Sequence, residues 1–397
     1  MLEVHRLFRN RFGFPPTYTV EAPGTVELLG NYADLHHGIA LAMSVDRSVS
    51  IAVAARTDGK VELAPSRSEC LESFSVLDTA PGHGSPTASQ LKSMLNALRQ
   101  RQAHCSGFST AIHSTIPTGS GLGSSSALKI AAALAVRQLH PFTLTATGIT
   151  VPPKRAADGA LPPLSNIEKL EIARTCLLTG NTATPEHSGL LAPVASLFSK
   201  EFHAVEIDCQ SFTIEPAPLI GEIAWVLCDT GIRHAEIDKT INDLRAECDA
   251  ATRALGVKSL RSVDASFLNA NRQRLNDRQF QCASHLVGET QRVVAATHAL
   301  RDGDFAQFGQ FMYQSHESSR DLFGNSCAEL DELVALAKIH PGCLGARLTG
   351  RGFGGSTLNL VHSAQADSFA KAISTVYEKR TGRRITPLIC KPADGAN

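Results

Sequence analysis

Glycines and serines are gathered in one short stretch of the chain, and these residue types suit the binding of phosphate. The stretch consists of Gly119, Ser120, Gly121, Leu122, Gly123, Ser124, Ser125 and Ser126. Glycine allows positive φ and a close approach of the backbone to a ligand. The apolar run that follows, as far as Leu139, predicts that a helix begins at the serines, where free N–H groups favour an anion. We therefore expect a polyphosphate-binding loop; the plain alternative is a turn that only caps the helix.

This loop differs from the two commonest phosphate-binding patterns. No Gly-Lys-Ser or Gly-Lys-Thr closes it, so it is not a P-loop. Its three glycines alternate with other residues instead of following G-x-G-x-x-G, so it is not a dinucleotide fingerprint. A different phosphate-binding family has to be considered.

The composition bounds the class of protein and its partners. A chain of 397 residues is too long for one ordinary core and predicts two domains in close contact. Lys plus Arg equals Asp plus Glu at 38 each, so no basic field points to nucleic acid or to a membrane surface. The ten cysteines form no C-x-x-C pair, which favours reduced thiols, no zinc site and a cytoplasmic location. No run is long enough to span a bilayer, and a monomer is expected.

Hydrophobic periodicity predicts the elements that must hold the loop in place. A short strand at 18–22 and a loop at 22–38 precede a half-buried strand at 39–54. Residues 140–166 lack periodicity and predict an exposed loop. The remaining strands are expected at 109–116, 203–207, 223–228 and 357–361, and the helices at 88–102, up to 139, at 167–178, from 237 onwards and over most of 264–338.

Three separated motifs agree in their order with one known family. Residues 22–38 are similar to the galactokinase signature A-P-G-R-V-N-L-I-G-E-H-T-D-Y-N-x-G. Residues 116–128 resemble the family's phosphate loop, and residues 348–356 resemble its third motif, T-G-x-G-F-G-G-C. The chain therefore resembles the GHMP kinases, and galactokinase among them, over nearly all of its length except residues 140–166.

The resemblance implies a two-domain α+β fold with the active site between the domains. Residues 1–215 would form a domain like the second domain of ribosomal protein S5, and residues 216–397 a ferredoxin-like domain. The implied reaction transfers the γ-phosphoryl group of ATP to the anomeric hydroxyl of galactose, with Mg²⁺. Ser125 is the candidate metal contact. Lys129 stands where the family has Glu, which weakens that assignment.

Two catalytic positions of the family carry other residues here. The catalytic Asp corresponds to Ala192, and the catalytic Arg of the first motif corresponds to Thr25. Phosphoryl transfer depends on positioning, on a proton acceptor and on neutralising charge. Ala has no proton acceptor and Thr carries no charge, so neither residue can do the original task.

The implied sugar-binding residues diverge in part. Asn31 and Tyr32 stand where the family has a Glu-His pair, whereas Asp34 and Gly189 are retained. Asp34 is the best candidate for a sugar contact, and the alternative is an aspartate that caps a turn. Further along the chain, four glycines are expected to form the active-site wall or, alternatively, a tight turn before a strand. They are Gly350, Gly352, Gly354 and Gly355.

Three residues are candidates to replace the missing proton acceptor. Glu186 and His187 lie just before the Gly189 segment, and Glu27 stands where the first motif has Asn. Histidine suits proton transfer at neutral pH. The plain alternative for each is a solvated loop residue, because nearness in sequence does not establish reach.

Two functions remain open at this stage. The first is an ATP-dependent sugar kinase of the galactokinase type whose activity on galactose is weak, altered or lost. The second is a galactokinase-like pseudokinase that binds nucleotide, and a hexose in addition, as a sensor or regulator.

Overall fold

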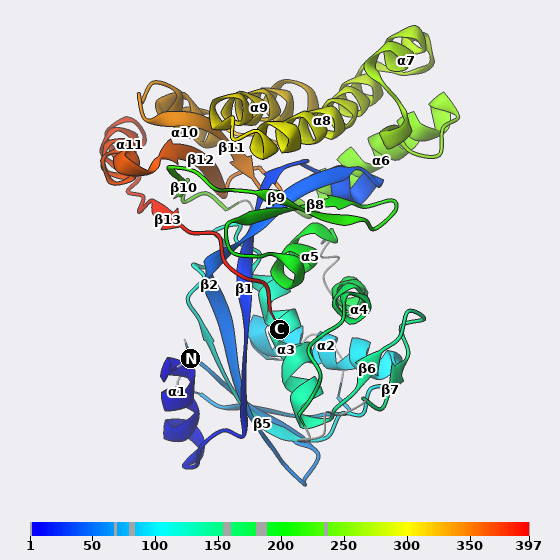
Figure 1. The fold of residues 1–397 in the computed structure, drawn as a ribbon, viewed down its shortest axis with the longest axis vertical. Helices are drawn as coiled ribbons and strands as arrows, with labels where there is room; N and C mark the ends of the chain where they lie inside the picture. The colour runs from blue at the N-terminus through cyan, green and yellow to red at the C-terminus, as the bar shows by residue number, and fades with distance from the viewer. Residues whose placement is uncertain are drawn as a thin grey trace.

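The computed structural model describes residues 2–66, 70–78, 84–153, 160–179, 189–233 and 237–396. Figure 1 shows two halves stacked along the long axis, each made of a sheet with helices packed on it. The predicted two-domain α+β architecture is confirmed. Among the described residues, no helix combines the length and the apolar character that a membrane span requires.

A seven-stranded sheet forms the frame of the first half. Its two long central strands, β1 and β2, reach upward to the second half (Figure 1). The order is β4-β3-β5-β2-β8-β9, with β1 paired to β2, and only the β3–β5 pair is parallel. The strands are β1 (Tyr18–Leu29), β2 (Ile39–Ala55), β3 (Lys60–Pro65), β4 (Glu72–Ser75), β5 (Phe108–Ser114), β8 (His203–Asp208) and β9 (Ile214–Pro218).

The prediction of a loop over residues 22–38 is wrong for its first part, because β1 continues to Leu29. Pro23 and Gly24 look like a strand end in the sequence, but the pairing of β1 with β2 passes them with a register shift. A Cβ placed on Gly24 would lie 2.8 Å from the Leu122 carbonyl oxygen, so glycine lets β1 pass close to the phosphate loop. After Leu29 the chain makes a short 3₁₀ turn, η1 (Ala33–His36).

Helix α3 is the buried centre of the first half. It is apolar nearly all round, as the sequence predicts, and packs against β1, β2 and three helices. On the other face of the sheet, Val4 and Phe8 of α1 pack against Ala52 and Ala111. The helices are α1 (Leu2–Phe12), α2 (Pro86–Gln100), α3 (Ser124–Leu139), α4 (Asn166–Leu178) and α5 (Leu191–Phe198). The prediction of an exposed loop at 140–166 is wrong in part, because Phe142 and Leu144 are buried in the core and a small hairpin forms, β6 (Thr143–Leu144) with β7 (Thr150–Val151).

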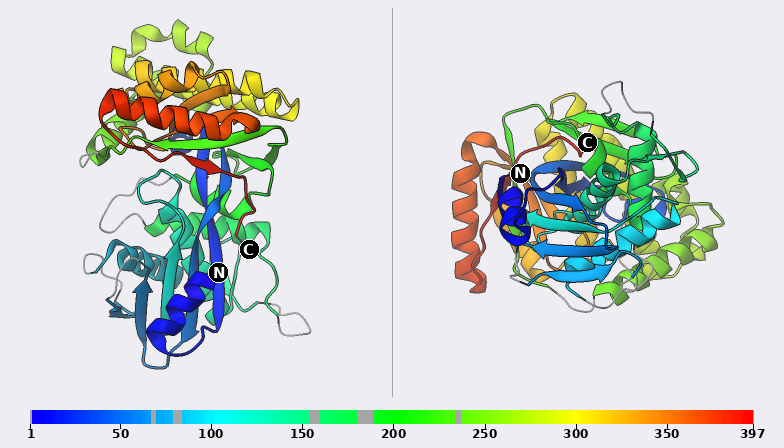
Figure 2. Two further views of the ribbon diagram at one scale, coloured as in Figure 1. Left: turned by 90° about the vertical axis from the view of Figure 1, so that its left-hand side faces the viewer. Right: turned by 90° about the horizontal axis from the view of Figure 1, so that it is seen from below.

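The second half is a four-stranded antiparallel sheet covered by helices, in agreement with the expected ferredoxin-like domain (Figure 2). Its order is β11-β12-β10-β13. The strands are β10 (Ile223–Asp229), β11 (Cys343–Thr349), β12 (Ser356–His362) and β13 (Leu388–Cys390). The helices are α6 (Ile237–Leu255), α7 (Ala265–Ala270), α8 (Asp277–Arg301), α9 (Phe305–Ser318), α10 (Ala328–Lys338) and α11 (Ala366–Thr381), with short turns η3 (Leu260–Ser262), η4 (Arg272–Arg274), η6 (Ser363–Gln365) and the π-helical η5 (Ser319–Phe323).

The chain changes sheets between Pro218, the end of β9, and Ile223, the start of β10. The boundary predicted at 215/216 stays a prediction, and it falls inside β9. After β13 the chain returns to the first half, where the Ala396 N–H donates to the Ser196 carbonyl at 2.8 Å. The C-terminus therefore lies beside α5 (Figure 1).

A buried carboxylate joins the two halves. Glu289 of α8 is fully buried, and its Oε2 accepts hydrogen bonds from the N–H groups of Gly30 and Asn31 at the end of β1, each at 3.0 Å. Its Oε1 accepts from Arg292 Nε at 2.7 Å. Burial raises the pKa of Glu289, but the charges of Arg292, His285 and Arg347 outweigh burial and hold it at about 2. The ionised form is thus built into the junction.

We expect Glu289→Gln to lower the free energy of unfolding by about 3–5 kcal/mol at pH 7, because an amide donor would then face backbone donors. The folded pKa lies below the unfolded value of 4.5, so the carboxylate stabilises the fold above that pH. The difference between the two proteins should therefore shrink as the pH falls from 4.5 towards 2. Denaturant unfolding across this range is the measurement.

Glu317→Gln is the matched control, since Glu317 is 49% exposed and pairs with Lys338 at the surface. It should change the free energy of unfolding by less than about 1 kcal/mol. Equal stability of Glu289→Gln and the unmodified protein at pH 7 would contradict the role of Glu289 at the junction.

Candidate active site

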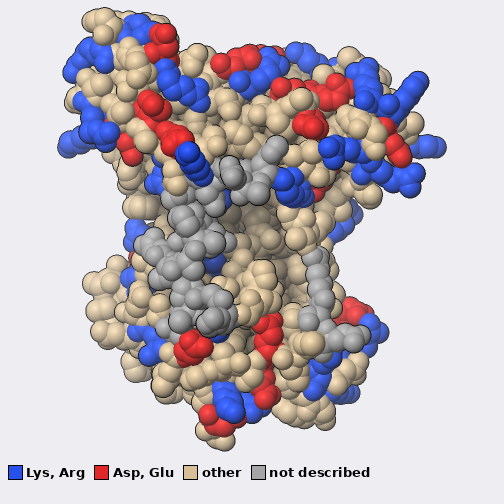
Figure 3. Space-filling view, turned by 180° about the vertical axis from the view of Figure 1, so that it is seen from behind, with Lys and Arg blue, Asp and Glu red and all other residues tan. Residues whose placement is uncertain are grey.

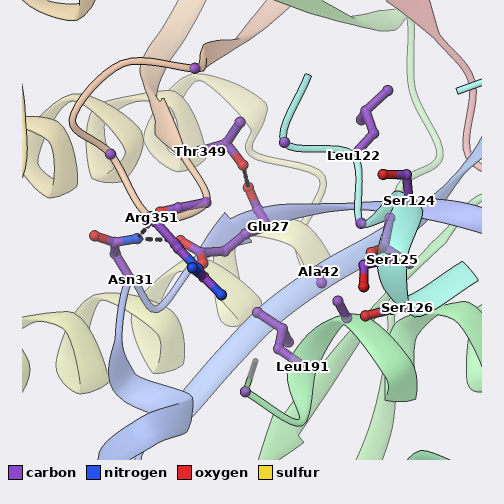
Figure 4. Close-up of a pocket in the computed structure, with 18 of the residues that line it drawn as sticks. Glu27, Asn31, Ala42, Leu122, Ser124, Ser125, Ser126, Leu191, Thr349 and Arg351 are labelled. Carbon is purple, nitrogen blue, oxygen red and sulfur yellow. Dashed lines mark hydrogen bonds between the residues drawn. The ribbon is translucent and has the colours of Figure 1, made fainter. Parts of the chain in front are cut away.

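A cavity of about 400 Å³ lies where the two halves meet. Figure 3 shows the molecule hollowed between its two halves, and Figure 4 shows the side chains that line the cavity. Its walls come from β1 and η1, the phosphate loop, the start of α5, and the 350–355 loop between β11 and β12. A cavity thus lies at the place between the domains where the site is predicted.

The phosphate loop has the predicted place, after β5 and directly before α3. Gly119, Gly121 and Gly123 all have positive φ, and α3 begins at Ser124 with Gly123 as its N-terminal cap residue. The glycines, Leu122 and the three serines that open α3 line the cavity. Ser120 is the exception, because it is buried and its hydroxyl donates to the Pro117 carbonyl at 2.9 Å. The cavity therefore faces the N-terminus of α3.

The second glycine loop lies against the first. Residues 349–355 line the same cavity, and Ser356 Oγ donates to the Ser120 carbonyl at 2.8 Å. Gly350, Gly352, Gly354 and Gly355 have positive φ. A side chain on Gly352 would collide with Asn325, so this loop is a close-packed wall as well as a turn. The two predicted readings of these glycines are compatible.

Thr25 and Ala192 both lie close to Gly123, at the start of α3. A side chain on Gly123 would collide with the Thr25 hydroxyl and would lie 3.6 Å from the Ala192 methyl group. The Thr25 N–H also donates to the Leu122 carbonyl at 3.0 Å, so this end of the cavity is held by the backbone. Two residues far apart in the sequence are therefore brought to one place, and neither of them is an acid or a cation.

Asp34 lies against the segment that begins at Gly189. A side chain on Gly189 would collide with Asp34 Oδ2, so only glycine leaves room for this carboxylate. Burial, and then the charge of Glu27, raise the pKa of Asp34 to about 7, although the Leu191 N–H acts in the opposite direction. A carboxylate so costly to ionise is typical of a functional site.

Asn31 and Tyr32 line the cavity, but their polar atoms bond to the protein. The Asn31 amide donates to Glu27 Oε1 at 3.0 Å and to the Gly350 carbonyl at 2.7 Å, while its oxygen accepts from Asn325 Nδ2 at 2.8 Å. The Tyr32 hydroxyl donates to the Arg351 carbonyl at 2.9 Å. Their sugar contact stays a prediction, and their observed task is to hold the 350–355 loop.

Glu27 is the candidate proton acceptor that the structure brings to the cavity. Arg347, which is fully buried, donates to Glu27 Oε1 at 2.9 Å and to the Leu28 carbonyl at 3.1 Å. Burial raises the pKa of Glu27, and Arg347 and Asn31 act against that rise. The other two candidates, Glu186 and His187, lie outside the described residues.

Two arginines line the cavity that were not among the predicted site residues. Arg233 follows β10, pairs with Asp229 at 2.5 Å and packs so close to Gly119 that a side chain there would collide with it. Arg351 lies in the second glycine loop. The signal for Arg233 was present in the stretch Asp229-Thr-Gly-Ile-Arg-His234, which is similar to a galactokinase stretch. Arg351 stands at the variable position of the third motif, and the sequence leaves open whether its side chain meets a phosphate or solvent.

A magnesium ion finds few protein ligands in this cavity. Among the described residues there is no group of three His, Cys, Asp or Glu side chains that could hold a metal. Mg²⁺ is commonly bound by one or two carboxylates together with substrate phosphates. Ser125 lines the cavity and offers a hydroxyl, whereas Lys129 is buried where the family's carboxylate would stand. The donor set therefore fits an ion held mainly by the phosphates of a nucleotide.

Comparison with protein families gives three matches in chain order. Residues 6–55 match the galactokinase galactose-binding signature, residues 89–151 the GHMP kinases N terminal domain, and residues 296–379 the GHMP kinases C terminal model. These are the segments that contribute β1, the phosphate loop and the 350–355 loop.

Full-length relatives agree with these matches. The galactokinase of Chloroflexus aurantiacus is 32% identical over 99% of this chain and 96% of its own length, and human galactokinase is 31% identical over 100% and 96%.

Solved structures agree as well. The Lactococcus lactis galactokinase, solved in complex with galactose, has a TM-score of 0.87 at 25% identity over 99% of this chain and 98% of its own. The mevalonate kinase of Methanococcus jannaschii, at 16% identity, a TM-score of 0.59 and coverage of 95% and 98%, shares the fold. The identity to the two galactokinase sequences exceeds 30% over nearly the whole chain, and the fold is that of the GHMP kinases. The chain therefore belongs to the galactokinase family of GHMP kinases.

Proposed function

We propose that this chain binds ATP at the 119–126 loop and a hexose beside Asp34 and Gly189, and that its transfer of phosphate to galactose is weak or altered. The observation that carries the proposal is that Thr25 and Ala192 both lie close to Gly123, at the start of α3. These positions hold the catalytic Arg and Asp of the galactokinase motifs, and here they hold a hydroxyl and a methyl group.

Nucleotide binding is supported by the geometry of the phosphate loop. Its glycines leave room for a polyphosphate next to the backbone, and the N-terminus of α3 supplies free N–H groups and the positive end of the helix dipole. Arg233, beside Gly119, adds a positive charge at the same edge. We propose that Mg²⁺ arrives with the nucleotide and contacts Ser125.

Weak transfer follows from the loss of two catalytic groups. Removing a general base or a charge-stabilising group commonly costs about a hundredfold or more in rate. When an acid and a cation are lost together, no unpaired charge is left beside the phosphate loop. The stability of the fold is therefore not lowered by an unpaired charge. Of the three candidates for a substitute base, Glu27 is the one that lies within the described residues. Its Oε1 accepts from Arg347 and Asn31, whereas its Oε2 makes no hydrogen bond to the described residues.

The second candidate function is a pseudokinase that binds nucleotide and hexose as a sensor or regulator. The same pair of positions supports it, because a cavity that lacks the acid and the cation still has its phosphate loop and Asp34. Cytoplasmic location and a monomeric state stay predictions for both functions.

Restoring both groups should restore activity. We expect Thr25→Arg with Ala192→Asp to raise the rate of galactose 1-phosphate formation by about a hundredfold or more. Each single substitution should raise the rate much less than the two together, because it places one charge in the cavity without the opposite charge of the other. A transfer assay with ATP, Mg²⁺ and a panel of free hexoses measures this.

Thr375→Arg, on the exposed face of α11, is the control for adding an arginine and should leave the rate unchanged. Rapid turnover of galactose by the unmodified chain would refute weak transfer. Turnover of another hexose would instead identify an altered specificity. Nucleotide binding without turnover of any sugar would support the pseudokinase, and the absence of ATP binding would overturn both functions.

The pH dependence of stability tests the role of Asp34. Its folded pKa of about 7 lies above the unfolded value of 3.8, so its stabilising contribution is full below pH 4 and is lost as the pH rises to 7. Asp34→Asn should therefore become more stable than the unmodified chain over this window. We expect about 1–2 kcal/mol at pH 8, after discounting for water in the cavity. Thermal melts at pH 4 to 8 are the measurement.

Hexose binding by Asp34→Asn should weaken by about tenfold or more at pH 8, because the ionised carboxylate is the better acceptor for sugar hydroxyls. Asp302→Asn, at an exposed position, should alter neither the pH dependence nor the binding. A variant that is stabilised but binds the hexose normally would assign Asp34 to the fold and not to the sugar.

A further inference from the structure

The backbone around Arg351 is held by three hydrogen bonds. The Arg351 carbonyl accepts from the Tyr32 hydroxyl at 2.9 Å and from Asn325 Nδ2 at 3.2 Å, and the preceding Gly350 carbonyl accepts from Asn31 Nδ2 at 2.7 Å. Gly350 and Gly352, on either side, both have positive φ. Such a backbone fixes the point from which the Arg351 side chain extends.

Two of the three donors are residues at which this chain departs from the family signature. Asn31 and Tyr32 replace the Glu-His pair of that signature, and Arg351 occupies the variable position of T-G-x-G-F-G-G. Asn31 is also held by Asn325 and Glu27, so its amide has one fixed orientation. The substitutions in the first motif therefore support the loop of the third motif.

The Arg351 side chain enters the cavity. It lines the cavity, and Figure 4 shows it extending from the 350–355 loop towards the cavity centre. Its charge is also felt by Tyr32: burial raises the pKa of the Tyr32 hydroxyl, and Arg351 acts in the opposite direction. A guanidinium that reaches into a cavity can bind two oxygens of a phosphate at once.

The loop that carries Arg351 faces the phosphate loop. A Cβ on Gly121 would lie 3.8 Å from the Thr349 carbonyl oxygen, and Ser356 bonds to the Ser120 carbonyl. Arg233 lies at the Gly119 edge of the same loop. The polyphosphate proposed at this loop would thus have a cation at the Gly119 edge and a second one across the cavity.

We propose that Arg351 binds the terminal phosphoryl group of the nucleotide, as the cation that position 25 no longer supplies. This inference rests on the proposed ATP site. Asn31 and Tyr32 are positioning residues in this arrangement. Arg351 neutralises charge on the phosphoryl oxygens and forms no covalent bond.

The test is the affinity of the full chain for ATP and for ADP, with Mg²⁺, measured by calorimetry. Arg351→Gln should weaken ATP binding by about tenfold or more and change ADP binding by less than about twofold, because ADP lacks the terminal phosphoryl group. Arg351→Lys should recover part of the ATP affinity. Tyr32→Phe, which removes one hydroxyl, should cause a smaller loss that is again confined to ATP.

Arg384→Gln is the matched control, since Arg384 is 81% exposed and pairs with Glu378 at the surface, and it should bind both nucleotides normally. Thermal melts verify that each variant is folded. An equal loss of ATP and ADP affinity in Arg351→Gln, or no loss, would overturn the inference while leaving the ATP site intact. Failure of the unmodified chain to bind either nucleotide would overturn the proposed function itself. Binding of galacturonate that depends on Arg351 when ATP binding does not would assign the cation to an anionic sugar and refute the phosphoryl contact.

Discussion

The orientation of Asn31 is the constraint on which the candidate active site depends. Its backbone N–H is bonded to the buried Glu289 of α8, and its side chain bonds to Glu27, to the Gly350 carbonyl and to Asn325. Buried polar groups are costly unless they are bonded, so these partners must be present together. The end of β1, helix α8 and the 350–355 loop are thereby held in one arrangement. The cavity between the two halves is a result of that arrangement.

The charges around the cavity follow the same rule, that a buried polar or charged group needs a partner. The family signature has Asn and Glu at the positions where this chain has Glu27 and Asn31, so an acid and an amide have exchanged places four residues apart. Glu27 keeps a buried cationic partner, Arg347, and the exchange therefore leaves no buried charge unpaired. Asp34 differs, because burial and the charge of Glu27 raise its pKa. An ionised carboxylate at this position lowers stability, and this cost is the observation behind the sugar contact proposed for Asp34.

Much of the fold was predictable because periodicity and composition act locally. The alternating residues of β2 and the apolar run of α3 predict those elements nearly to their ends. The course of β1 was missed because Pro23 and Gly24 imitate a strand end, and the bulge that absorbs them is set by the pairing with β2. Helix α5, with eight residues, is too short for a reliable periodic signal. Pairing and packing across the molecule decided both cases.

The candidate site was predictable to a similar degree. The pattern of glycine and serine predicts the phosphate loop without any knowledge of the tertiary structure, because glycine geometry and helix N-termini act locally. The approach of both Thr25 and Ala192 to Gly123, and the role of Asn31 as a bridge, bring together residues separated by more than a hundred positions. In the sequence, Asn31 and Tyr32 therefore look like lost sugar ligands.

The structure gives these two substitutions a different meaning. If the sugar-side residues had simply decayed, nothing would require their replacements to satisfy one another. Asn31 and Tyr32 instead donate to consecutive carbonyls, those of Gly350 and Arg351. A loop fixed in this way loses little backbone conformational entropy when its arginine meets a ligand. A cavity that holds Thr25 near the phosphate loop and Arg351 on a fixed backbone is the arrangement on which the proposed phosphoryl contact rests.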